Sequence, residues 1–121
     1  MVYDFFMKKM TGYIPSLLDD VRSQLVSAFG DFRGLYFYGS RVVGTPREDS
    51  DYDIILVFDT IDYSKKLKIA GIIGTIEYKH AVIVDYKIFT TTGKRSIEYI
   101  RKYVNPFFIQ QSVDNGMFYG R

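Results

Sequence analysis

Cysteine is absent from this chain of 121 residues, and histidine occurs once. Without cysteine there is no disulfide framework and no thiolate chemistry, which fits a reducing compartment. No apolar run approaches the roughly 18 residues that a membrane span needs. The first residues lack the basic start, apolar region and cleavage site of a secretory signal. These absences predict a cytoplasmic protein without a membrane association.

A strong charge of either sign is also missing. The chain has 16 Lys and Arg against 14 Asp and Glu, a formal net charge of +2, which is too small to indicate nucleic-acid binding by itself. Aromatic side chains are abundant instead, with 11 Tyr and 10 Phe. Such side chains either fill the core of a small domain or mark a surface for a partner.

The central stretch, residues 35–58, reads LYFYGSRVVGTPREDSDYDIILVF. Residues 35–38 are apolar and aromatic and are bounded by Gly34 and Gly39, which predicts a buried strand. Gly39 and Ser40 then form a turn, and residues 41–43 are expected to start a helix. Free backbone N–H groups at such a turn suit a phosphate.

Two carboxylates follow this loop. Asp51 and Asp53 stand one residue apart at the entrance of a predicted strand, residues 54–58. Alternate side chains of a strand project to the same side, so the two carboxylates are expected to lie together. Their mutual repulsion is relieved if a cation such as Mg²⁺ lies between them. The alternative is a pair that is merely solvated at a strand entrance.

The Gly-Ser pair, the ten residues after it and the segment D-Y-D-I together resemble the signature of the DNA polymerase β-like nucleotidyltransferase superfamily. The form G-S-R-x-x-G followed by S-D-x-D is most similar to its minimal nucleotidyltransferase branch. The resemblance implies that Gly39 and Ser40, with Arg41, bind the phosphates of a nucleoside triphosphate. Arg41 and Arg47 are otherwise ordinary surface charges.

The same resemblance implies two Mg²⁺ ions, which Mn²⁺ can replace, bound by Asp51, Asp53 and a third carboxylate from a later strand. Asp85, in A-V-I-V-D-Y-K-I-F, is the candidate, and it would also take the proton of the acceptor. An Asp in a strand can instead pair with a neighbour such as Lys87. His80, between a predicted helix and a strand, is expected on the surface rather than at a metal.

The implied reaction moves a nucleoside monophosphate, AMP from ATP, onto an acceptor hydroxyl and releases pyrophosphate. A chain of this length leaves little besides the transferase core. The resemblance therefore implies a separate helical partner of the HEPN type, a tyrosine of which is modified, with this chain as the antitoxin of a toxin–antitoxin pair. Binding of the partner by contact alone is one alternative, and transfer to RNA or a small molecule is another. A homo-oligomer and the choice of base stay open.

The order of predicted elements favours an α/β or α+β fold, a small mixed sheet covered by helices. The resemblance implies the polymerase β-like palm. We expect one nucleotidyltransferase domain over residues 1–121, with a motif core at 33–90 and a C-terminal helical segment at 94–113; residues 1–13 receive no role. The remaining expected elements follow in chain order: a helix from 14 to a left-handed stop at Gly30, a helix capped by Asp62 or Ser64 that includes Ile69 to Ile76, a strand at 81–89, a helix at 97–104, a helix at 107–113 opened by Asn105 and Pro106, and an edge strand at 117–119.

Overall fold

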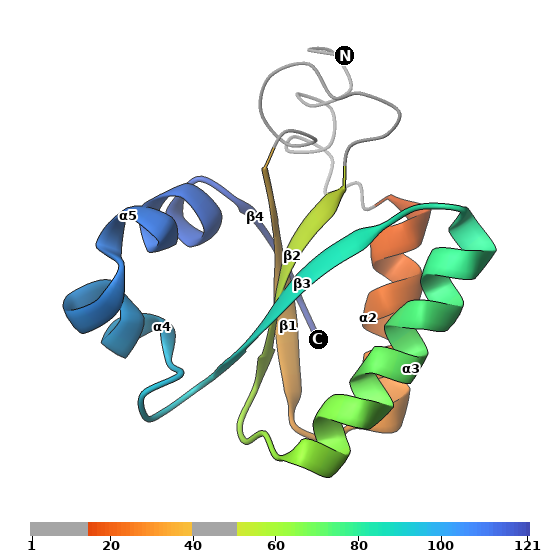
Figure 1. Cartoon of the computed structure of the whole chain (residues 1–121), viewed down its shortest axis with the longest axis horizontal. Coiled ribbons are helices and arrows are strands. Elements are labelled where there is room, and N and C mark those ends of the chain that lie inside the picture. Colours follow the sequence, from red (N-terminus) through yellow and green to blue (C-terminus); the bar gives the residue numbers. More distant parts are fainter. Residues whose placement is uncertain (1–14, 40–50) are drawn as a thin grey trace.

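A mixed sheet of four strands forms the centre of the computed structural model, which describes residues 15–39 and 51–121. The strands follow the order β3-β2-β1-β4, with β2 and β3 parallel and the other neighbours antiparallel. The small mixed sheet expected from the sequence is therefore confirmed, and Figure 1 shows helices on both of its faces. The strands are β1 (Phe32–Tyr38), β2 (Tyr52–Phe58), β3 (Val84–Thr90) and β4 (Met117–Gly120).

Two long helices cover one face of the sheet, α2 (Ser16–Ala28) and α3 (Tyr63–His80). Their buried positions recur every three or four residues, so each helix presents one apolar stripe to the sheet. Asp62, one of the two predicted caps, begins α3 by accepting a hydrogen bond from the backbone N–H of Lys65. The core on this face contains Leu17, Leu18, Val21, Leu25, Phe32, Leu35, Phe37, Ile54, Leu56, Phe58, Ile69, Ile73, Ile76, Val84 and Tyr119.

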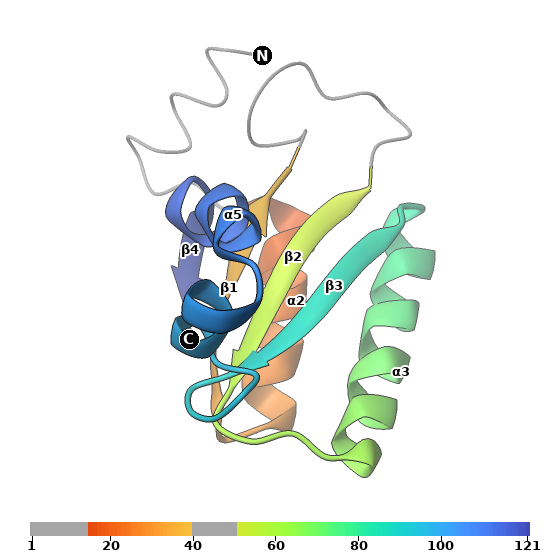
Figure 2. The same ribbon diagram turned by 60° about the vertical axis from the view of Figure 1, so that its left-hand side comes forward.

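The opposite face is partly covered by the C-terminal segment (Figure 2). Its elements are α4 (Ile97–Tyr99), the π-helical η1 (Ile100–Val104), α5 (Pro106–Ile109) and the π-helical η2 (Gln110–Asp114). Asn105 caps α5 through a 2.9 Å hydrogen bond from the N–H of Phe108, with Pro106 in the first turn, as the sequence predicts. The smaller core beneath these helices contains Ile55, Val57, Phe89 and Ile109.

Several predicted boundaries were wrong. Strand β2 begins at Tyr52 rather than at residue 54, so Asp53 lies within the strand. Helix α2 ends with Phe29 in an extended conformation, and Gly30 is not left-handed. Strand β1 continues through Gly34, which has φ +142° and lies at an irregularity in the pairing with β2. Strand β3 starts at Val84, because Ala81 ends α3 in a left-handed conformation with φ 54°.

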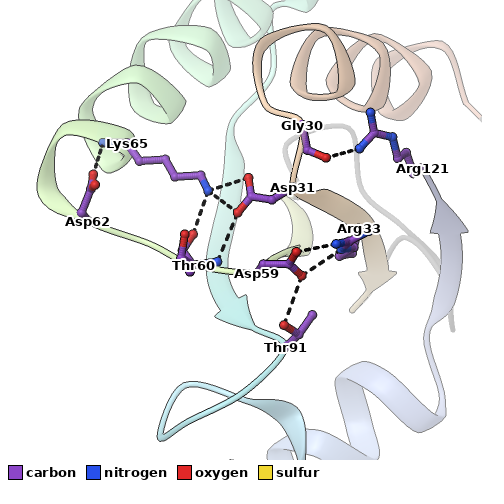
Figure 3. A network of polar contacts seen from close by, with 9 residues as sticks. All are labelled: Gly30, Asp31, Arg33, Asp59, Thr60, Asp62, Lys65, Thr91 and Arg121. Carbon is purple, nitrogen blue, oxygen red and sulfur yellow. Dashed lines mark hydrogen bonds and ion pairs between the residues drawn. The ribbon is translucent and has the colours of Figure 1, made fainter.

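A polar network ties the ends of β1 and β2 to α3 (Figure 3). The ammonium of Lys65 binds both carboxylate oxygens of Asp31 and the carbonyl oxygen of Thr60, and it lies 4.7 Å from the ring centroid of Phe58. These contacts join three elements through one side chain that is only 13% exposed. The arrangement is therefore structural.

No helix in residues 15–39 and 51–121 combines the length and apolar character that a membrane crossing requires.

Candidate functional site

Asp53 and Asp85 occupy paired positions on neighbouring parallel strands. Asp53 of β2 is in register with Asp85 of β3, and on its other side it is in register with Tyr38 of β1. Paired residues in adjacent strands point to the same face, and neighbouring strands lie about 4.8 Å apart. This is the face that carries the C-terminal helices, because the intervening positions Ile54 and Tyr86 belong to the core under α2 and α3. We call Asp53 and Asp85 the carboxylate pair.

The surroundings of the carboxylate pair disfavour a negative charge on Asp53. Partial burial, followed by the charges of Asp85 and Asp51, raises the pKa of Asp53 above its usual value. Burial and the charges of both members of the pair raise the pKa of the Tyr38 phenol to about 12. Asp51 directly precedes β2, on which Asp53 lies. The charges of Asp85 and Asp51 thus act on Asp53, as like charges do when little solvent separates them.

Gly39 closes the site beside Asp53. It has φ +89°, a conformation that favours glycine, and it follows directly after β1. A Cβ at this position would collide with Oδ2 of Asp53 and lie 3.0 Å from Cγ. The carboxylate therefore occupies space that only glycine leaves free, and the predicted turn residue and the predicted ligand are neighbours.

Lys87 and Phe108 complete the surroundings of the carboxylate pair. Nζ of Lys87 lies 3.9 Å from Oδ1 of Asp85 and 5.5 Å from the ring centroid of Phe108. The Phe108 ring contacts Tyr38 edge to face, with the centroids 5.8 Å apart. The sequence suggests Lys87 only as a pairing partner of Asp85. Phe108 carries no signal in the sequence, since its position depends on how the C-terminal segment folds back over the sheet.

The structure places some of the predicted site residues close together, and others lie outside the residues that it describes. Within the described ranges, no group of three or more histidine, cysteine, aspartate or glutamate side chains is arranged so that it could hold a metal ion. The close partners are the two members of the carboxylate pair, with Asp51 adjacent. The predicted phosphate-binding residues Ser40 and Arg41 lie outside the described residues, as does the helix expected at 41–43.

His80 forms no part of this arrangement. It is the last residue of α3 and lies on the opposite side of the sheet, where its Nε2 is 3.1 Å from a carboxylate oxygen of Asp20 on α2. The contact links the two long helices. His80 was expected on the surface, but its side chain is partly buried and connects α2 with α3.

Comparison with known families agrees with this geometry. The family model described as "Nucleotidyltransferase domain" matches residues 18–116. The matched residues include the Gly39-Ser40 pair, the Asp-x-Asp segment and Asp85. No curated protein matches the chain. Because the match spans most of the sequence, the chain belongs to the nucleotidyltransferase domain family, within the DNA polymerase β-like superfamily.

Proposed function

We propose that this protein transfers a nucleoside monophosphate, AMP from ATP, to an acceptor hydroxyl with release of pyrophosphate. The observation that carries the proposal is the register of Asp53 with Asp85 beside Gly39. Two carboxylates from separate strands on one face, next to Gly39, supply oxygen ligands for a cation, and such a cation can stabilise the charge that transfer to a hydroxyl builds up. The family match supports the reaction class.

Divalent cations, Mg²⁺ or Mn²⁺, fit the donors present. Mg²⁺ prefers oxygen ligands and is often held by one or two carboxylates, with water and substrate phosphates completing its shell. The carboxylate pair would supply two protein ligands, and Asp51, which precedes β2 and is not grouped with the pair in this structure, is the proposed third. Burial, followed by the charges of Asp85 and Asp51, raises the pKa of Asp53, and a bound cation would relieve the part that is due to charge. When bound, such ions supply charge stabilisation for the phosphoryl oxygens and lower the pKa of a bound hydroxyl.

Other residues are proposed to bind the phosphates and to accept the proton of the acceptor hydroxyl. Gly39 allows the carboxylate of Asp53 to lie directly against the backbone, and Ser40 and Arg41 follow Gly39 in sequence as the proposed ligands of the outer phosphates. Asp85 lies on the edge strand β3 with its side chain 50% exposed. An acceptor can therefore reach it, and Asp85 is the proposed proton acceptor.

For the acceptor we propose a tyrosine of a helical HEPN-type partner, with this protein as an antitoxin of the minimal nucleotidyltransferase branch. Support comes from the spacing of the G-S and D-x-D segments, which is most similar to that branch. The test incubates the protein with ATP, Mg²⁺ and the product of the neighbouring reading frame, and measures by mass spectrometry whether a partner tyrosine gains AMP. No gain with active protein would refute this acceptor.

The site itself is tested by Asp53→Asn, which removes one charge of the carboxylate pair and keeps the size of the side chain. The matched control is Asp19→Asn on α2, a half-exposed carboxylate on the opposite side of the sheet. We expect Asp53→Asn to abolish transfer and Mn²⁺ binding, and Asp19→Asn to preserve both. Equal activity of the two variants would exclude the proposed site.

The double variant Asp51→Asn with Asp53→Asn separates the proposal from a protein that acts by contact alone. An enzyme loses both transfer and protection of the cell from the partner, whereas a contact-only antitoxin still protects. Transfer to RNA or a small molecule would appear instead as AMP incorporation without any protein partner.

A further inference from the structure

Lys87 places a positive charge beside the carboxylate pair. It stands two residues after Asp85 on β3, so that both side chains project to the same face of the sheet. The ammonium is 3.9 Å from Oδ1 of Asp85, and the two side chains are 44% and 50% exposed. The positive charge of Lys87 also acts on Asp53: it lowers the pKa of this carboxyl, whereas the charges of Asp85 and Asp51 raise it.

Phe108 keeps this ammonium in place. The Lys87 ammonium lies 5.5 Å from the centroid of the Phe108 ring, within the range of a cation–π interaction. The ring is itself fixed by edge-to-face contacts with Tyr38 and Phe89, at centroid distances of 5.8 Å and 6.3 Å. An exposed ion pair by itself has little effect because its partners move freely. Here an aromatic cluster restricts the lysine to the neighbourhood of the carboxylates.

We propose that Lys87 is the counter-ion of the carboxylate pair: it offsets part of the negative charge of Asp53 and Asp85 when no divalent cation is bound, and it opposes the binding of that cation. The role rests on the proposed function, because it concerns the same metal ligands. A divalent ion that arrives alone meets the repulsion of the ammonium. An ion that arrives with a triphosphate brings negative charge with which Lys87 can pair, so Lys87 favours joint binding of metal and nucleotide over metal alone.

The test measures Mn²⁺ binding to the full chain at low salt, from the electron paramagnetic resonance signal of free Mn²⁺. Lys87→Gln removes the charge, Lys87→Arg keeps it, and Lys66→Gln removes one charge from an exposed position on α3. Without nucleotide, we expect Lys87→Gln to bind Mn²⁺ about three- to tenfold more tightly, since an ion–ammonium repulsion at this range is partly screened by water. Lys87→Arg and Lys66→Gln should stay within about twofold of the unaltered protein.

The second measurement repeats the titration with ATP present. In the unaltered protein ATP should tighten Mn²⁺ binding by a larger factor than in Lys87→Gln, because only the former has an ammonium to be neutralised by phosphate. Unchanged or weaker Mn²⁺ binding by Lys87→Gln would overturn the counter-ion role, even if its melting temperature fell. If Mn²⁺ binding is lost in Asp53→Asn but unaffected in Lys87→Gln, the proposed site stands and the role of Lys87 falls. If the unaltered protein binds no Mn²⁺, both fall.

Discussion

Replacement of Gly39 by alanine tests the link between the turn and the carboxylate pair. The backbone at Gly39 has φ +89°, and a Cβ there would displace the carboxylate of Asp53. The conformation alone costs a residue other than glycine about 1–3 kcal/mol. Moving the Asp53 side chain away from its rotamer adds about 0.5–1.5 kcal/mol. A displacement of about 1 Å at a reacting centre can lower a rate about a hundredfold, so we expect transfer to suffer more than stability.

Gly93 provides the matched control. Its φ is +84°, close to that of Gly39, but a Cβ there would meet no atom within 4 Å. Gly93→Ala therefore carries the backbone cost without the collision. Urea denaturation should show a loss of about 1–3 kcal/mol for Gly93→Ala and a somewhat larger loss for Gly39→Ala. Mn²⁺ binding and AMP transfer should decline only in Gly39→Ala. Full Mn²⁺ binding by Gly39→Ala would refute the reasoning that ties this glycine to Asp53.

Two further predictions concern stability. Hydrogen bonds from Gln24 and His80 lower the pKa of Asp20 from 3.8 to about 2, so its contribution is complete above pH 3.8 and is lost as the pH falls toward 2. The unfolding free energy of Asp20→Asn should accordingly vary less with pH over this range, and parallel curves would contradict the assignment. Alanine at Gly71 or Gly74 should raise the unfolding free energy by about 0.5–1 kcal/mol each, because both lie within α3 and a Cβ there meets no neighbour. Destabilisation in urea would show that this reasoning is wrong.

Local patterns in the sequence were sufficient to predict most elements of the fold. The three- and four-residue spacing of Ile69, Ile73 and Ile76 identified α3, and Asp62, one of the two predicted caps, begins it. In the segment A-V-I-V-D-Y-K-I-F, Asp85 alternates with Val84 and Tyr86, and this alternation indicates the face on which Asp85 lies. These features depend on neighbours in the sequence, which is why they could be predicted.

Features that depend on distant contacts could not be predicted in this way. Gly34 looked like a strand boundary, but the ring of Phe118 from β4 lies where a Cβ of Gly34 would be, and the strand continues beneath it. The π-helical ends of the C-terminal helices also gave no local signal. For the site, the spacing around Asp51 and Asp53 predicted the acidic residues, whereas the position of Phe108 beside Lys87 required the folded chain.

The parallel pairing of β2 with β3 has a consequence for errors in folding. The register that pairs Asp53 with Asp85 also pairs Ile54 with Tyr86 and Leu56 with Ile88. A slip of one residue would turn Asp85 toward the apolar interior and expose its hydrophobic neighbours. The burial of apolar side chains that stabilises the native register therefore makes a shifted register of β2 and β3 less stable. The same side chains thus determine how the two strands align.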